Sequence, residues 1–295
     1  MQLQIPWFSP TNLYGNLRLN PNHWGYGSLI AAIVPNYTFR PAIYIGPAGI
    51  NRFPAIFASG GNQAHVAVRR GFGMKFTGGS ANQILLTVNK TIYSGLPSIS
   101  FVGQFQNNSS GASTDGFRKD GEFTPIQATS TTNAQAAIWT DQLYTLAYPN
   151  TYGATDVVTC GATWSLTDSN QLRTYQSING RAIATSNTAL GVGTVVATNA
   201  ATPQCIGGNE GGAELFVGNI FHGYYFSMLL TPSQIASLFI DPAQIFVRDE
   251  DDLFAELVGV TAAVAPTFFQ GSTPDFLWQK LTAQPYGPMT GVSSH

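Results

Sequence analysis

Residues 157–180, VVTCGATWSLTDSNQLRTYQSING, carry the pattern that decides the fold. Apolar residues alternate with small or polar ones over 157–164 and again over 172–178, as in strands that bury one face. Asn179-Gly180 follows, the dipeptide that best tolerates the positive φ of a two-residue type I′ turn. The stretch therefore predicts one strand and then a β-hairpin, with 181–185 as the second arm of the hairpin.

A central strand and a helix are expected downstream. Residues 220–230 are mostly apolar on both parities, which is typical of a strand covered on each face. Thr231, Pro232 and Gln234 then supply a helix cap, a proline at the first helical position and the second half of a capping box. Further strands are predicted over 99–105, with one buried face, and over 135–139 and 143–148.

Composition narrows the class of protein. The chain has 295 residues, enough for one large β-sandwich with extensions or for two small domains. Charged residues make up 9% of it, against about a quarter in a typical soluble protein, so solubility must rest on uncharged polar groups. The net charge of −2 argues against nucleic acid as a partner, and no apolar stretch is long enough for membrane insertion.

The amino terminus and the cysteines bear on location. Residues 1–6 have neither the basic region nor the apolar core of a secretory signal. A sparsely charged, Thr/Asn/Gly-rich β chain is nevertheless typical of exposed surfaces. A protein that is made in the cytoplasm and ends on the outside of a particle reconciles the two. Whether Cys160 and Cys205 pair stays open, and a reducing compartment favours two buried thiols.

Three regions differ in composition. Residues 1–69 hold seven of the 17 prolines and are expected to form a lead-in, with short strands near 43–45 and 55–57, that packs on the sandwich or on a neighbour. Residues 70–245 are the expected sandwich. Residues 246–295 are a C-terminal extension, an acidic helix start followed by coil rich in proline and aromatic residues. Aromatic side chains of the two ends are expected to contact partners: Trp7, Phe8, Trp24, Phe254, Phe268, Phe269, Phe276, Trp278 and Tyr286.

Several motifs resemble a known family. Residues 73–79, GMKFTGG, look like the early strand of laminin-G-like, concanavalin A-like jelly rolls, and Trp164, Asn179-Gly180 and the helix start follow in the family's order. Residues 238–246, LFIDPAQIF, are similar to the ending of bacteriophage-encoded members. The resemblance implies an all-β, two-sheet antiparallel jelly-roll sandwich with one short helix after the last strand. For members with this ending it also implies a virion-associated or tail-associated role.

Catalysis is not expected. Glycoside hydrolases of this fold carry Glu-x-Asp-x-Glu, or a variant one residue longer, on one strand, which sets two carboxylates about 5–5.5 Å apart. None of the five glutamates stands in that pattern. Glu210 and Glu214 are four residues apart, but Gly211-Gly212 between them is typical of a turn. A glycoside hydrolase is therefore only a remote alternative.

One loop carries candidate glycan ligands. Tyr148, Asn150, Tyr152 and Asp156 combine aromatic rings with an amide and a carboxylate over nine residues. Rings that stack on sugars beside polar groups that bind hydroxyls suit a carbohydrate. A role in the core or in a turn is the alternative for these residues.

A second loop carries candidate cation ligands. Asp115, Asp120 and Glu122 form an oxygen-rich group of the kind that calcium prefers. Arg118 and Lys119 stand in the same stretch and would offset its charge. A solvated polar loop without metal is the alternative.

Two functions follow from these patterns. The favoured one is a non-enzymatic structural subunit of a virion, such as a capsid decoration, head–tail or tail-associated protein, with other virion proteins and copies of itself as partners. The other is an adhesin that binds a host-surface glycan through rim loops. No cofactor is required by either, and calcium is an option for the second.

Overall fold

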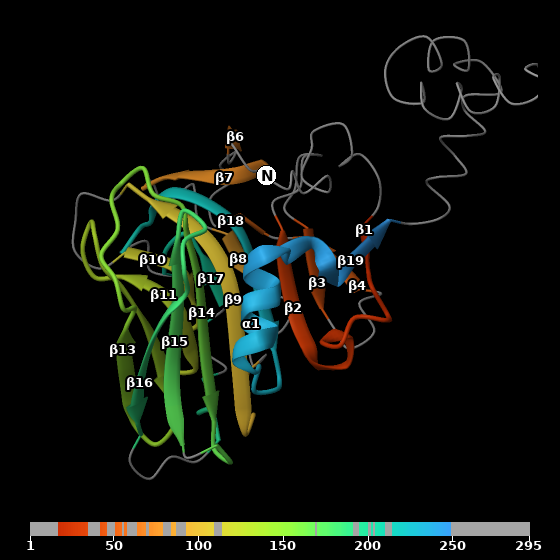
Figure 1. Ribbon diagram of the computed structural model, residues 1–295, viewed down its shortest axis with the longest axis vertical. Helices are drawn as coiled ribbons and strands as arrows, with labels where there is room; N and C mark the ends of the chain where they lie inside the picture. Colours follow the sequence, from red (N-terminus) through yellow and green to blue (C-terminus); the bar gives the residue numbers. More distant parts are fainter. Residues whose placement is uncertain are drawn as a thin grey trace, which may run out of the picture. The chain divides into compact units, whose positions relative to one another are not determined.

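The computed structural model describes residues 17–34, 42–45, 51–54, 56–57, 64–68, 71–78, 84–86, 93–108, 114–168, 170–190, 195–199, 202, 204–209 and 214–248. The chain divides into two compact units, Met1–Tyr14 with Arg18–Val247, and Gly15–Leu17 with Arg248–His295. The first unit contains nearly all of the described elements, and it is a β-sandwich of two antiparallel sheets with one short helix (Figure 1).

The larger sheet has ten strands. Its main path is β16-β15-β14-β9-β18-β2-β3-β4, and β7, which carries β6, also pairs with β18. These strands are β16 (Ala184–Ala189), β15 (Gln171–Ile178), β14 (Val158–Ser165), β9 (Ser98–Asn107), β18 (Val217–Phe226), β2 (Leu29–Val34), β3 (Ala42–Ile45), β4 (Asn51–Pro54), β7 (Gly71–Thr77) and β6 (Ala64–Val68).

The smaller sheet has seven strands in the order β13-β12-β11-β10-β17-β8-β5. They are β13 (Leu143–Ala147), β12 (Ala134–Trp139), β11 (Phe123–Ala128), β10 (Thr114–Arg118), β17 (Gln204–Ile206), β8 (Ile84–Leu86) and β5 (Ile56–Phe57). The remaining elements are a two-stranded ladder of β1 (Leu17–Leu19) and β19 (Phe246–Arg248), the helix α1 (Pro232–Ile240), and the 3₁₀ turns η3 (Tyr26–Ser28) and η5 (Pro242–Ile245).

The core between the two sheets is aromatic. The rings of Phe101 on β9 and Phe117 on β10 lie 5.2 Å apart, and Tyr225 on β18 contacts both. Tyr93 stacks on Tyr225 at 4.8 Å, and Phe123 meets the same ring edge-on. None of these five side chains is accessible to solvent. Aromatic pairs in such geometries add specific attraction to their burial, so this cluster ties the two sheets together.

The sequence-predicted hairpin is confirmed, with one adjustment. Asn179 and Gly180 have φ of 54° and 74°, and the N–H of Arg181 donates to the carbonyl of Ile178 at 3.0 Å, as a type I′ turn requires. The second arm, β16, begins at Ala184 instead of 181. A two-residue turn would set Gln176 opposite Ile183, but Gln176 faces Ala184. The second arm of the hairpin therefore contains one extra residue between the turn and β16.

The helix and the central strand are confirmed. Thr231 caps α1 through a complete capping box with Gln234, and Ile235 and Leu238 are buried beneath the helix. β18 is paired on both sides and buried from its second residue onward. Among the described helices, none is long and apolar enough to cross a membrane.

One expectation for β9 is wrong. It was predicted to bury a single face, but Ser100 and Val102, on the opposite face, are also fully buried. Ser100 is accommodated because its hydroxyl donates to the carbonyl of Met228 at 2.7 Å and accepts from the N–H of Leu230 at 3.0 Å. The segment that leads into α1 therefore covers this face of β9.

The proline-rich region 1–69 contributes strands to both sheets, so the sandwich begins well before residue 70. β2, β3 and β4 extend the larger sheet beyond β18, and β5 closes one end of the smaller sheet. The prolines do not interrupt the hydrogen bonding of the sheets, because most of them stand between strands. Pro54 is the last residue of β4, which is itself the last strand on its path. The predicted extension 246–295 lies outside the described residues from residue 249 onward.

Cys160 and Cys205 do not pair. Both are buried free thiols, on β14 of the larger sheet and β17 of the smaller sheet. Burial raises the pKa of Cys160 to about 12, so this thiol stays protonated.

Candidate functional site

The predicted glycan-binding tyrosines lie in the core. Tyr148 is 5% exposed and its hydroxyl donates to the carbonyl of Pro125 at 2.7 Å. Tyr152 is 3% exposed and its hydroxyl accepts from Asn107 Nδ2 at 3.2 Å. Neither ring presents a face to a ligand, and the alternative that the sequence left open, a packing role, accounts for both.

The other two predicted glycan ligands lie at the rim of the sandwich. Asn150 is exposed, and its backbone N–H donates to Gln176 Oε1 at 2.7 Å. The carboxylate of Asp156 accepts from the N–H of Gly153 at 2.7 Å and from Asn179 Nδ2 at 2.6 Å. These hydrogen bonds lower the pKa of Asp156 and fasten its loop to the hairpin turn, which is a turn-stabilising role.

The three predicted cation ligands do not converge. Glu122 is fully buried and its Oε1 lies 3.5 Å from Nζ of the buried Lys119. Its carboxylate also accepts from the N–H groups of Tyr93 at 3.3 Å and Asn199 at 3.1 Å. Burial raises the pKa of Glu122, and these hydrogen bonds and Lys119 act in the opposite direction. Glu122 therefore anchors the neighbouring loops from inside.

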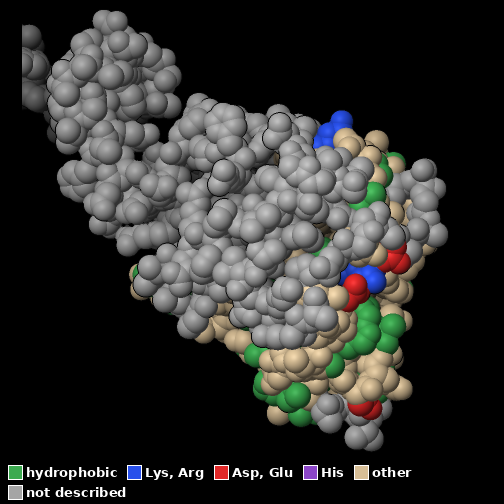
Figure 2. Space-filling view, turned by 180° about the vertical axis from the view of Figure 1, so that it is seen from behind, with side chains coloured by type: hydrophobic (Ala, Val, Ile, Leu, Met, Phe, Trp, Pro, Cys, Tyr) green, Lys and Arg blue, Asp and Glu red, His purple; other side chains and the backbone are tan. Residues whose placement is uncertain are grey.

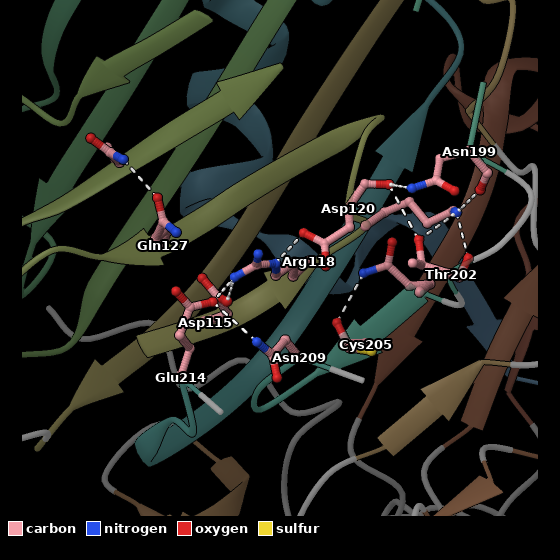
Figure 3. A network of polar contacts seen from close by, with 12 residues as sticks. Asp115, Arg118, Asp120, Gln127, Asn199, Thr202, Cys205, Asn209 and Glu214 are labelled. Carbon is pink, nitrogen blue, oxygen red and sulfur yellow. Dashed lines mark hydrogen bonds and ion pairs between the residues drawn. The ribbon is translucent and has the colours of Figure 1, made fainter. Parts of the chain in front are cut away.

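Asp115 and Asp120 point instead at Arg118 (Figure 3). The guanidinium group of Arg118 forms ion pairs with both carboxylates and with Glu214, which Asn209 Nδ2 contacts at 3.2 Å. The positive charge among these carboxylates thus comes from an arginine. Within the described ranges, no group of three or more His, Cys, Asp or Glu side chains is arranged to hold a metal ion.

This network continues across the sheet through amides. Gln135 Nε2 on β12 donates to Gln127 Oε1 on β11 at 2.6 Å, and the side chain of Gln127 hydrogen bonds to Asp115 on β10. We call the set the polar row. Its members are Gln135, Gln127, Asp115, Arg118, Asp120, Glu214 and Asn209.

The polar row lies on the face of the smaller sheet that is turned away from the aromatic core. Arg118 follows the core residue Phe117 on β10, so strand alternation places it on the other face. The side chains of Arg118, Asp120 and Glu214 are 17%, 31% and 31% exposed, whereas that of Asp115 is buried. Burial raises the pKa of Asp115 to about 6, and Arg118 pulls it in the opposite direction.

Sequence reasoning found part of the polar row. The short spacing from Asp115 to Asp120, with Arg118 between them, was visible. Glu214 is 96 residues from Arg118, and no local pattern links the two. On the face shown in Figure 2, charged side chains gather in a few small groups and the rest of the described surface is uncharged, in keeping with the low content of charge.

A second polar set lies on β18. Three atoms there are buried without a hydrogen-bond partner in the described structure: Asn219 Oδ1, His222 Nε2 and the hydroxyl of Tyr224. The rings of His222 and Tyr224 stack at 4.8 Å, and burial lowers the pKa of His222 to about 3. We call these three residues the β18 polar group.

The β18 polar group lies where β18 changes partner. Residues Val217 to Ile220 pair with β7, and Gly223 to Phe226 pair with β2. His222 falls between the two ladders, beside an irregularity in the pairing with β9. From its place on a predicted central strand, His222 is expected to be a hydrogen-bonded core residue or a semi-buried one. The structure confirms the burial, and Nε2 has no hydrogen-bond partner in the described structure.

Of the aromatic residues expected to contact partners, only Trp24 lies within the described residues. Its ring stacks on Phe226 with centroids 5.9 Å apart and leans on His23 at 4.4 Å. It is 39% exposed, so it packs on the end of β18 and keeps part of its surface in solvent. The others lie outside the described residues, and their partner contacts stay predictions.

Comparison with known proteins places this chain by structure alone. No family model and no curated protein matches its sequence. The binding domain of Paraclostridial Mosquitocidal Protein 1 is similar over 72% of this chain and 52% of that domain, with 12% identity and a TM-score of 0.51. The carbohydrate-binding module CBM40 of the Ruminococcus gnavus IT-sialidase, bound to α2,3-sialyllactose, is similar over 56% of this chain and 95% of that module, with 17% identity and a TM-score of 0.41.

A third similar structure is the binding domain of botulinum neurotoxin serotype D/C. The similarity extends over 72% of this chain and 52% of that domain, with 13% identity and a TM-score of 0.45. The chain thus spans about half the length of the two toxin domains. The expected all-β fold of two antiparallel sheets with one short helix after the last strand is confirmed by the structure, and at 12% identity the likeness to the mosquitocidal protein domain concerns the fold alone. Bacteriophage origin, virion location and virion partners stay predictions.

Proposed function

We propose that this chain is a carbohydrate-binding module that holds a neutral glycan on the polar row and performs no catalysis. The observation that carries the proposal is the polar row itself, in which amide, carboxylate and guanidinium groups line up across three neighbouring strands. Sugar hydroxyls donate and accept hydrogen bonds, so fixed donors and acceptors side by side suit them.

An aromatic ring lies on the same strand and face as one end of this row. Trp139 is on β12, four residues from Gln135, so strand alternation puts both on the same face about 13 Å apart. The ring is partly exposed, unlike Tyr148 and Tyr152. An indole face covers the apolar side of a sugar ring while polar groups bind its hydroxyls. Trp139 is therefore the stacking residue of the proposal.

The charge of the polar row favours neutral sugars. Arg118 contributes one positive charge against three carboxylates, those of Asp115, Asp120 and Glu214. Arg118 forms its ion pairs with these three carboxylates, so the polar row as a whole carries an excess of negative charge. An anionic sugar such as sialic acid would bring a carboxylate into that field and be disfavoured.

Two further points support a binding role. The similar mosquitocidal protein domain is described as a binding domain. In addition, a retaining glycosidase needs one carboxyl group free to protonate the substrate and another free to attack it. In the polar row all three carboxylates engage Arg118.

The test is a glycan array followed by titration calorimetry with the full chain. We expect retention on neutral oligosaccharides and at least about tenfold weaker binding to a sialylated partner of the same core, such as sialyllactose against lactose. Gln127→Ala and Trp139→Ala should each weaken binding about tenfold, because each removes one principal contact. Gln171→Ala, a partly exposed glutamine on β15 of the other sheet, is the matched control and should bind normally.

Three outcomes would overturn the proposal. The first is that no glycan is held. The second is that binding is lost in Asn150→Ala or Asp156→Ala and retained in Gln127→Ala, which would move the site to the rim. The third is that chromatography of the incubated glycan shows cleavage products, which would make the protein an enzyme.

A further inference from the structure

The larger sheet ends in a strand without the usual protection against edge pairing. β16 has the sequence ATSNTA and is the terminal strand of its path. Natural edge strands carry charges, proline or bulges that prevent another strand from adding. β16 contains no charged residue and no proline, and its register with β15 runs without a shift. In the described part of the chain, no strand pairs with its outer side.

The register between β15 and β16 shows which backbone groups point outward. The N–H of Leu190 donates to the carbonyl of Asn170 at 2.8 Å, in the same register that sets Gln171 opposite Ala189. Bonded and non-bonded pairs alternate along an antiparallel ladder, so Ala184, Ser186 and Thr188 bond to β15. The outward groups are those of Thr185, Asn187 and Ala189.

A second ladder agrees with this assignment. The side chains of Thr185, Asn187 and Ala189 share one face of the sheet and are exposed. On the other side of β15, the N–H of Asn179 donates to the carbonyl of Val157, which puts the ladder between β14 and β15 in the complementary phase. Among the outward groups, the carbonyl of Ala189 receives a long 3.5 Å bond from Thr188 Oγ1.

We propose that β16 pairs with β16 of a second copy of this chain across a two-fold axis, so that two sandwiches share one continuous antiparallel sheet. An axis perpendicular to the sheet keeps every side chain on its own face, so outward residues must face outward residues. Centring the axis on Asn187 sets Asn187 opposite itself and Thr185 opposite Ala189. All three bonded pairs then lie inside the strand. Centring it on Ser186 would leave Ala189 facing Ile183, outside β16.

The surroundings of β16 fit a second copy. Its side chains are small and uncharged, so two copies meet without like-charge repulsion. Arg173, on the adjacent strand, is already paired with Asp168 at 2.8 Å. β13, the last strand of the smaller sheet, lies on the same side of the sandwich (Figure 1) and presents Leu143, which is 50% exposed.

Cysteine cross-linking tests the register in the full chain. Residues of a bonded antiparallel pair have Cα atoms about 5.5 Å apart, which is within the range of a disulfide. Asn187→Cys should therefore form a covalent dimer under mild oxidation, seen on a non-reducing gel. Asn133→Cys, at an exposed position between β11 and β12, is the control and should stay monomeric. Absence of a dimer in Asn187→Cys, or equal cross-linking of both variants, would overturn the proposal.

A proline substitution tests the hydrogen bonds. Asn187→Pro removes an N–H that points away from β15, so the folded monomer should tolerate it at this edge position. Each dimer loses two N–H donors, and we expect self-association about thirtyfold weaker by analytical ultracentrifugation. Asn187→Ala should associate like the unmodified protein. An unmodified protein that is monomeric at every concentration measured would refute the pairing, as would unchanged association of a folded Asn187→Pro.

Discussion

The polar row is partly exposed and the β18 polar group is buried, and the two are stabilised in different ways. In the polar row, all three carboxylates form ion pairs with Arg118. In the β18 polar group, His222, Tyr224 and Asn219 are neutral, and each has a buried atom without a hydrogen-bond partner in the described structure. The polar row thus contains charged groups that are paired with an opposite charge. The β18 polar group contains neutral groups with atoms that have no hydrogen-bond partner in the described structure.

The difference shows what burial demands of each kind of group. A charge is retained in a low-dielectric site only beside an opposite charge, and removing one partner exposes the full desolvation cost of the other. A neutral polar group can be left without a partner at a cost of about 1–3 kcal/mol. The two regions should therefore respond in opposite ways to mutation and to pH.

Arg118→Ala gives the largest expected effect. It leaves three carboxylates facing one another without their counter-charge, one of them buried, and we expect a loss of about 4 kcal/mol of unfolding free energy at pH 7. The loss should be smaller at pH 5, where Asp115 is protonated. Urea denaturation at both values measures it. Arg173→Ala is the matched control: its pair with Asp168 is partly exposed, so about 1 kcal/mol or less is expected. Equal losses in the two variants would show that the ion pairs of Arg118 stabilise the fold no more than a partly exposed pair does.

His222→Gln tests the β18 polar group through acid stability. The pKa of His222 is about 3 in the folded state and 6.5 when unperturbed, so the unfolded chain takes up the proton first. The contribution of neutral His222 to the free energy of unfolding is therefore fully present above pH 6.5. It is lost as the pH falls toward 3, and the loss is about 3 kcal/mol at pH 4. The variant should lack this loss. His23→Gln, at a half-buried histidine, should change the profile less, and identical profiles for all three proteins would contradict the account.

Asp115→Asn tests the polar row with the opposite sign. The folded pKa of Asp115 is about 6 against an unperturbed 3.8, so the folded protein holds its proton longer than the unfolded chain. Its contribution is present below pH 3.8 and is lost as the pH rises through 6, by about 2–3 kcal/mol. The variant should show a flatter curve between pH 4 and 7. Asp168→Asn, in a partly exposed pair, serves as the control. A steeper curve in Asp115→Asn than in the unmodified protein would contradict the sign.

Thr231→Ala is expected to have the smallest effect on stability. It tests whether the two sheets respond independently. It removes the side-chain cap of α1 and should cost about 1 kcal/mol. Because α1 packs beside β9 and β14, amide exchange should accelerate in the larger sheet first. The resonances of Arg118 in the smaller sheet should stay in place. Shifts there as large as those around α1 would show that the two sheets respond as one.

Local chemistry accounts for the elements that the sequence predicted well. The turn at Asn179-Gly180 and the start of α1 at Thr231 depend on φ preferences and on hydrogen bonds to residues within four positions. In the N-terminal region the sequence predicts a lead-in with short strands only near 43–45 and 55–57, where β3 and β5 lie, because the strands there are short and separated by prolines. Their membership of the sheets comes from partners such as β18, which stands almost two hundred residues later.

The candidate site likewise combines residues that are close in sequence with residues that only the fold brings together. Arg118 and its two neighbouring aspartates were visible as a charged stretch, but Glu214 and the amides of Gln127 and Gln135 join them only through strand order. For Tyr148 and Tyr152 the sequence left two roles open. The choice between a stacking surface and a core position depended on which sheet covered the rings, a property that no local pattern contains.

The sequence by itself determined that the chain alternates apolar and polar residues with period two, turns at Asn179-Gly180 and begins its helix at Thr231, because these depend on near neighbours along the chain. The tertiary structure decided which polar groups meet. Strands distant in sequence brought Glu214 to Arg118 and left His222 between two ladders, and burial and electrostatic energy depend on distances in space.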